Sequence, residues 1–372
     1  MNIYNYIDEY GIYSFSEKEF NDVDAVIFSF LSYAKLQDII MPNNKYTINQ
    51  VGRMHLGIYT EKDRNIIAVR EANRVLRYMK DTKRYKDCIL SKHETIYNND
   101  IQFGVVSIEY KKGYVYVSFE GTNELFSGWK EDFILGYEFP TLSHQKAIEY
   151  LNKNYTFSTK KLIVGGHSKG GNLALVASMY ANFFVRSKIK AIYNVDGPGL
   201  LEKEFTSKEY NKILPKYKHY MPEYSMIGVL LNHSNDFIVK SSKKGILAHN
   251  VVYWQIKENN FIFTELDPLS RELDKEIANW LKNHDVDDKK ELVENIDIIL
   301  DKAGIDSILD LKEDVRNVIN LIYESKDLSK QTQEALIDFF QIIVKCIANI
   351  KKEEIKSFIN KNILMKTSKE NE

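Results

Sequence analysis

The sequence contains few of the residues that define several classes of protein. Only two cysteines, Cys88 and Cys346, occur among the 372 residues, which leaves neither a disulfide framework nor a cysteine-based metal site. The formal net charge is only −1, so no global field attracts nucleic acid or anionic lipid. Internal repeats, low-complexity tracts and Pro/Gly/Ser-rich linkers are also missing. With 44% hydrophobic and 28% charged residues, the composition is typical of an ordinary globular protein.

Long uninterrupted hydrophobic runs are missing as well. The most apolar stretch, Phe339 to Ile350, contains Gln341, Lys345 and Asn349, so we expect no transmembrane helix. The first residues have neither the basic nor the apolar region of a secretory signal. We therefore expect a cytoplasmic location.

The chain divides into three regions of different pattern. Residues 1–95 are expected to be mostly helical, because apolar residues recur near a helical period in Val23 to Leu36 and in Ile66 to Met79. Residues 96–265 alternate strand-like and helix-like segments, which predicts a mostly parallel sheet with helices on both faces. Residues 266–372 are charged, poor in glycine and helical in period.

The middle region contains the predicted strands and helices that surround the candidate functional residues. A turn at Lys111-Lys112-Gly113 separates the first two of its predicted strands. Helices are predicted over residues 141–155 and 170–184. The predicted strands are Phe103 to Tyr110, Tyr114 to Phe119, Lys161 to Val164, Lys190 to Val195, Met226 to Leu231 and Val251 to Ile256.

The segment Gly166-His167-Ser168-Lys169-Gly170 matches the G-x-S-x-G pattern of a nucleophile elbow. The pattern alone is a weak signal, but here a buried strand precedes it and a helix with small residues follows it. An elbow holds its serine on a sharp strand-to-helix turn, and the glycines allow neighbouring backbone to approach closely. This context predicts an α/β-hydrolase fold with Ser168 as the nucleophile. The alternative interpretation is a glycine-rich structural turn.

A nucleophilic serine requires a histidine base and an acid that orients it, in the chain order serine, acid, histidine. Four histidines follow Ser168: His219, His233, His249 and His284. His284 lies in the charged C-terminal region, His233 precedes the nearest acid, and His219 could use Asp196. His249 lies just before a predicted strand and follows Asp236, so the preferred triad is Ser168, Asp236 and His249.

An oxyanion hole requires two backbone N–H groups that face the developing charge. One should come from Lys169, the residue after the nucleophile. The other should follow an earlier strand, and Thr122 comes directly after the strand that ends at Phe119-Glu120-Gly121. The Thr122 hydroxyl could add a third donor.

These motifs together resemble the class 3, or fungal-type, lipases. The resemblance lies in Phe119-Glu120-Gly121-Thr122, in Gly128 to Phe133, in Gly166 to Asn172, and in Asn235 to Val239 followed by His249. A bacterial family of lipase-like proteins of unknown function, common in Firmicutes, is similar over most of the chain. One difference is Glu120, where the family pattern usually has arginine.

The resemblance implies an esterase with Ser168, Asp236 and His249 as its triad and with Thr122 in the oxyanion hole. It implies a small acyl ester or lipid as substrate, and we expect no metal and no cofactor. It also implies a lid over Asn123 to Phe139, which would allow transient contact with a lipid surface, although an ordinary packed helix is the alternative. Two other functions stay open: a non-catalytic interaction protein on a hydrolase scaffold, and a peptidase or thioesterase with the same triad.

Overall fold

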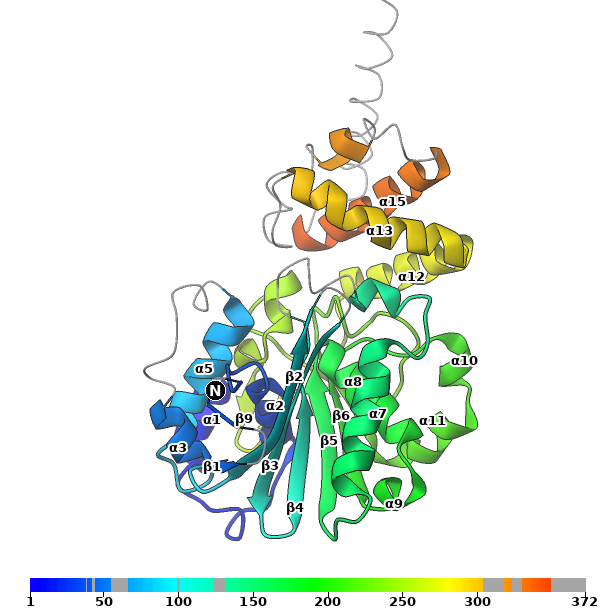
Figure 1. Cartoon of the computed structure of the whole chain (residues 1–372). Coiled ribbons are helices and arrows are strands. Elements are labelled where there is room, and N and C mark those ends of the chain that lie inside the picture. The colour runs from blue at the N-terminus through cyan, green and yellow to red at the C-terminus, as the bar shows by residue number, and fades with distance from the viewer. Residues whose placement is uncertain are drawn as a thin grey trace, which may run out of the picture. The chain divides into compact units, whose positions relative to one another are not determined.

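A computed structural model describes residues 1–37, 39–41, 44–54, 66–98, 101–122, 131–303, 318–322 and 330–348 (Figure 1). The chain forms two compact units, Met1–Asp274 and Lys275–Glu372. The first unit contains the predicted hydrolase core together with the N-terminal region.

The first unit is built on an eight-stranded sheet in which the strands follow one another in sequence order. Strands β1 to β4 pair in antiparallel fashion, whereas β4 to β8 are parallel neighbours. With helices on both faces, this arrangement confirms the predicted α/β-hydrolase class. The strands are β1 Lys45–Thr47, β2 Ile89–Tyr97, β3 Gln102–Lys111, β4 Tyr114–Phe119, β5 Lys161–His167, β6 Ile189–Val195, β7 Tyr217–Pro222 and β8 Asp236–Val239.

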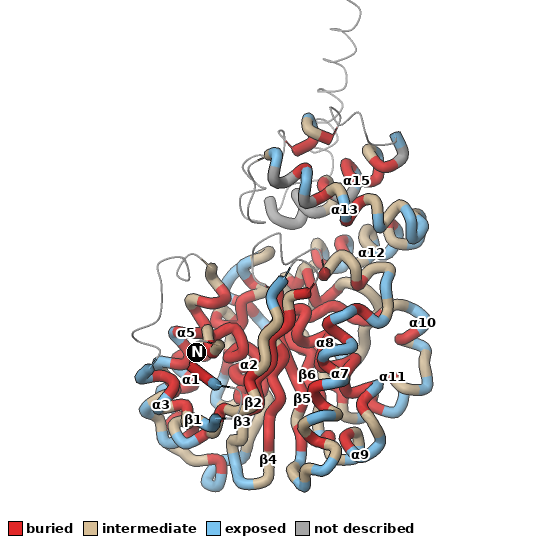
Figure 2. The backbone as a smooth tube through the Cα atoms, in the orientation of Figure 1, coloured by how far each residue is buried: buried red, intermediate tan, exposed pale blue. Residues whose placement is uncertain are grey.

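Helices cover the two faces of this sheet and enclose two hydrophobic cores. N-terminal helices pack on one face, where buried Phe28 and Leu76 join the inward side chains of the strands. On the other face Leu151 and Leu173 come from two central helices. Figure 2 shows the central strands β4, β5 and β6 as largely buried. The helices of this unit are α1 Ile3–Tyr10, α2 Asp22–Leu31, α3 Ile48–Met54, α5 Ile67–Met79, α7 Leu142–Tyr155, α8 Lys169–Tyr180, α9 Phe183–Arg186, α10 Glu202–Phe205 and α11 Lys208–Ile213.

Local sequence explains where several of these elements begin and turn. The Asn21 side chain accepts hydrogen bonds from the first turn of α2, and the Thr141 hydroxyl does the same for α7. Gly113 joins β3 to β4 at a φ of 82°, a conformation that glycine adopts without strain. The predicted strand–turn–strand unit and the predicted helix over residues 141–155 are thereby confirmed.

Two of the predicted strands are wrong. Val251 to Ile256 forms the 3-10 helix η4, Val251–Tyr253, before the two-residue strand β9, Ile256–Lys257, which pairs with β10, Asn260–Phe261. Met226 to Leu231 is irregular, because the Gly228 N–H bonds to side chains instead of a neighbouring strand. The sheet strand in this part of the chain is β7. It was not predicted because the polar residues Lys218 and His219 interrupt its apolar pattern.

The N-terminal region contains the strands β1 and β2 in addition to its helices. The second unit is helical where it is described, with α13, Val286–Ala303, in contact with α15, Lys330–Ala348. Helix α12, Pro268–Asn283, precedes them. Among the described residues, every helix is too short or too polar to span a bilayer.

Candidate active site

Ser168 lies on the sharp turn between β5 and α8. Its backbone has a φ of 57° and a ψ of −135°, a conformation that strains any residue with a side chain. The Ser168 N–H donates to the Val195 carbonyl oxygen at 2.9 Å, and the Ser168 carbonyl accepts from Gly171 N–H at 2.8 Å. This is the geometry of a nucleophile elbow, where surrounding structure holds a strained serine in place.

The two glycines of the motif are required because the backbone segments around them are in contact. A Cβ atom on Gly166 would lie 2.3 Å from the backbone of Gly170. A Cβ atom on Gly170 would lie 2.2 Å from the carbonyl oxygen of Phe119, at the end of β4. Side chains at either position would separate α8 from the sheet.

The base predicted from the sequence is bound by a different acid. His249 ends the 3-10 helix η3, Gly245–His249, and its Nδ1 lies 2.7 Å from Oδ2 of Asp196. Asp236 instead contacts Nδ1 of His219 at 2.8 Å and Nδ1 of His233 at 2.9 Å. The predicted pairing of Asp236 with His249 is therefore wrong, as is the alternative pairing of Asp196 with His219.

Sheet register explains why Asp196, and not Asp236, lies beside His249. His167 and Val195 are paired at the ends of β5 and β6, so the residues that follow them, Ser168 and Asp196, leave the sheet side by side. Asp236 begins β8, and at that point the strand enters the sheet. An acid directly after a buried strand, in Asn194-Val195-Asp196-Gly197, was the sequence signal for this arrangement.

The Asp196 carboxylate is held from both sides. Its Oδ1 accepts from the Ser225 hydroxyl and, at 3.1 Å, from the Gly228 N–H, while Oδ2 faces His249. The side chain is completely buried. Because each oxygen has its own donors, the carboxylate presents one defined oxygen to the imidazole.

A second histidine supports the first. His167 Nε2 donates to the His249 carbonyl oxygen at 2.8 Å, and its Nδ1 accepts from the Tyr33 hydroxyl at 3.0 Å. The two imidazole rings are 4.3 Å apart. Burial and the nearby His249 lower the pKa of His167 well below its usual value, so this ring is neutral. Tyr33 follows α2, and the N-terminal region therefore contributes to the support of His249.

The predicted oxyanion residues lie at the ends of neighbouring elements. Lys169 is the first residue of α8, and its side chain points away to a buried ion pair with Glu131, with 2.8 Å between Nζ and Oε2. Its contribution to an oxyanion hole would therefore come from the backbone N–H. Thr122 is buried two residues beyond the Glu120 that follows β4, and its hydroxyl lies beside the Asp132 carboxyl.

Asp132 lies next to this hydroxyl. Burial raises the pKa of the Asp132 carboxyl to about 6, while the Lys169 charge and the Thr122 hydroxyl oppose that rise. The predicted lid falls largely outside the described residues, because only residues 131–139 of that segment are described. Within that part, residues 131–134 are helical and Leu135 is buried.

Behind the elbow, a buried histidine links α7 to the loop that carries Asp196. His144 Nδ1 accepts from Thr141 N–H at 3.1 Å, and its Nε2 donates to Asn172 Oδ1 at 2.6 Å. The Asn172 amide then donates to the carbonyl oxygen of Gly199 at 2.7 Å. The neutral imidazole satisfies both contacts.

We predict that His144 makes the protein less stable as the pH falls. Burial lowers the pKa of His144 to about 4 from 6.5, so between these values the unfolded chain binds a proton that the folded protein does not. The free energy of unfolding should therefore fall with pH in this window, by up to about 1.4 kcal/mol per pH unit from this residue. Urea unfolding of wild type and His144→Gln between pH 4.5 and 6.5 should give a shallower dependence in the variant; equal slopes would contradict the prediction.

The sheet topology and the elbow define an α/β-hydrolase scaffold. The chain belongs to the Mbeg1-like family, whose model matches residues 79–297, more than half of the sequence. A search of curated proteins gave no match.

Solved structures of lipases are similar at low identity. M37 lipase is 16% identical, with coverage of 56% of this chain and 68% of that one and a TM-score of 0.35. Lipase II from Rhizopus niveus is 14% identical, with coverage of 67% and 86% and a TM-score of 0.38. The Rhizomucor miehei lipase in complex with its propeptide is 11% identical, with coverage of 65% and 82% and a TM-score of 0.37.

Proposed function

We propose that this protein is a serine hydrolase that cleaves carboxylic esters by acyl transfer to water. The observation that carries the proposal is the 2.7 Å contact between His249 Nδ1 and Asp196 Oδ2 beside the strained elbow of Ser168. A buried aspartate on Nδ1 fixes the tautomer in which Nε2 can accept a proton. The proposed triad is Ser168, His249 and Asp196.

In the proposed mechanism, His249 takes the Ser168 proton as the hydroxyl oxygen attacks the ester carbonyl. Asp196 holds the imidazole and stabilises it once it is charged. The backbone N–H groups of Lys169 and Thr122 stabilise the tetrahedral oxyanion, and the Thr122 hydroxyl supplies an additional donor. His249 then protonates the leaving alcohol, and water repeats the sequence on the acyl-enzyme.

The substrate class in this proposal is an acyl ester or a lipid, by resemblance to the lipases. A bacterial source and a cytoplasmic location stay predictions. A screen of p-nitrophenyl esters of increasing chain length, with purified wild-type protein, tests the activity and measures the preferred acyl length. Labelling by a fluorophosphonate probe distinguishes an active hydrolase from a non-catalytic interaction protein, because only an activated serine reacts.

Tyr33 provides a test of the support behind the base. In Tyr33→Phe the His167 Nδ1 loses its donor, so the ring that contacts the His249 carbonyl is held less firmly. Loss of one such hydrogen bond is worth about 1 kcal/mol, which predicts a decrease of about fivefold in kcat/KM.

Tyr116→Phe is the matched control. It removes another buried hydroxyl, one that bonds to Ser29 instead of to the site. Ester kinetics should be unchanged in this variant although both variants lose stability. Equal losses of kcat/KM in the two variants would mean that Tyr33 acts only through general stability.

A further inference from the structure

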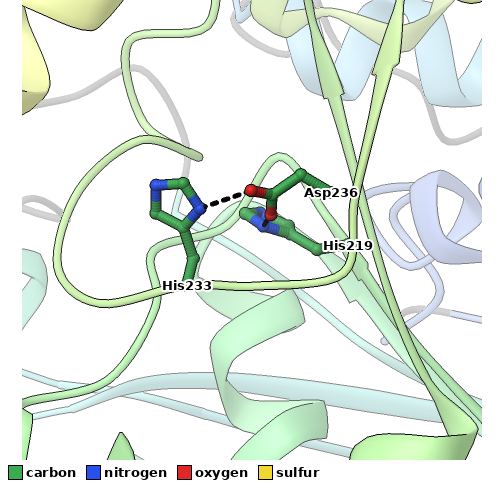
Figure 3. A group of neighbouring side chains, drawn as sticks. All are labelled: His219, His233 and Asp236. Atoms are coloured by element: carbon green, nitrogen blue, oxygen red, sulfur yellow. Dashed lines mark hydrogen bonds and ion pairs between the residues drawn. The ribbon is translucent and has the colours of Figure 1, made fainter.

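Three side chains outside the proposed triad converge on one point (Figure 3). His219 in β7 and Asp236 at the start of β8 are register partners, and His233 comes from the loop before β8. Nδ1 of each histidine contacts a different oxygen of the Asp236 carboxylate, at 2.8 Å for His219 and 2.9 Å for His233. The potential ligand atoms of the three residues all lie within 4.8 Å of one another.

Both ring nitrogens of His219 face hydrogen-bond acceptors. Its Nδ1 faces the Asp236 carboxylate, and its Nε2 lies 3.1 Å from the Gly197 carbonyl oxygen. Both partners are acceptors, so a neutral ring, which has a single N–H, can donate to only one of them. A cation bound at Nδ1 satisfies the same geometry with a neutral ring.

The Gly197 contact also resembles the support that metal-binding histidines receive. Such a histidine usually donates its second N–H to a carbonyl or carboxylate, which fixes the tautomer and the orientation of the ring. In the neutral ring that donates from Nε2 to Gly197, the Nδ1 lone pair is directed at the cluster.

Burial is graded across the cluster. The His219 side chain is fully buried, whereas the His233 and Asp236 side chains are 17% and 28% exposed. Within the described residues, the ion pairs of Asp236 are with these two histidines alone. The site is thus anchored on one side and open to water on the other.

We propose that His219 Nδ1, His233 Nδ1 and an oxygen of Asp236 bind one Zn²⁺ ion, with water as the fourth ligand. Two imidazole nitrogens and a carboxylate oxygen are a common donor set for zinc. Tetrahedral ligands at about 2.0–2.2 Å from the ion lie roughly 3.3 Å apart. The two nitrogen–oxygen contacts would lengthen slightly, and the remaining ligand atoms, which now lie within 4.8 Å of one another, would move closer together. This proposal replaces the expectation from the sequence that no metal is bound.

The role of such an ion would be structural. It would connect β7, β8 and the intervening loop, and through the His219–Gly197 contact it would support the residue next to Asp196. No step of ester hydrolysis uses it, so the zinc site and the esterase proposal can fail independently.

Zinc titration of the untagged full-length protein, after removal of metal with a chelator, tests the site directly. Isothermal calorimetry should give one Zn²⁺ per chain. His233→Ala should weaken binding by about a hundredfold or more, because one of three protein ligands is lost. His284→Ala, in the C-terminal unit, is the matched control and should bind zinc with wild-type affinity.

A second variant and a second measurement control for the case in which His233→Ala fails to fold. Asp236→Asn keeps the shape of the side chain but removes its charge, and it should also weaken zinc binding. Zinc should raise the melting temperature of wild type and of His284→Ala but of neither site variant. Less than one ion per wild-type chain, or equal affinity in wild type and both site variants, would overturn the proposal.

Discussion

Ser168→Ala should lower the rate of ester hydrolysis by about five to six orders of magnitude while the fold stays intact. The variant removes the only atom that can form the acyl-enzyme, and loss of a nucleophile typically has effects of that size. Alanine lacks the hydroxyl but fits the same strained turn, because Ser168 is held there by backbone hydrogen bonds from neighbouring segments. Steady-state kinetics on a p-nitrophenyl ester measure the change, and the variant should also lose labelling by a fluorophosphonate.

Ser178→Ala is the matched control for this experiment. Ser178 is buried in the same helix, α8, and the substitution removes the same atoms at a position away from the elbow. Hydrolysis should change by less than about twofold in this variant. Full activity in purified Ser168→Ala would show that the elbow is a structural turn and would remove the basis of the proposed function.

Most of the scaffold around Ser168 could be predicted from the sequence because local rules determine it. The alternating pattern and Gly113 specify the β3–β4 hairpin. The small residues after Ser168 allow α8 to pack closely on β5, and the clashes that side chains would cause at Gly166 and Gly170 explain the motif. In each case the cause lies within a few residues of the feature.

The strand β7 could not be found in this way. Lys218 and His219 interrupt its apolar pattern, and the polar partners that allow them to lie in a sheet strand come from other parts of the fold. Lys218 forms an ion pair with Asp22 of α2, and His219 is buried against Asp236. A local sequence pattern assigns a charged residue to the surface, because it contains no information about a neutralising partner that is distant in sequence.

The prediction of the acid that pairs with His249 was wrong for a related reason. Chain order admits both Asp196 and Asp236, since each lies between Ser168 and His249. The deciding fact is that β5 and β6 are direct neighbours with His167 opposite Val195, which brings Asp196 to the elbow. Strand order and register are long-range properties, and the sequence pattern contains little information about them.

Asp196→Asn should lower kcat/KM by about four orders of magnitude, and the structure explains why a nearly isosteric change is so damaging. The Gly228 N–H donates to Oδ1 and can only be satisfied by an oxygen, so the new amide must keep its oxygen there. Its NH₂ group then faces His249 Nδ1, which has to accept instead of donate. This places the ring proton on Nε2, where it blocks transfer from Ser168, and the wrong tautomer in such a triad typically reduces the rate by about 10⁴-fold.

Asp236→Asn is the matched comparison, because it makes the same substitution at the aspartate that bonds His219 and His233, and it should lower kcat/KM far less. A larger loss in Asp236→Asn than in Asp196→Asn, with both variants folded by thermal denaturation, would return the role of the acid to Asp236.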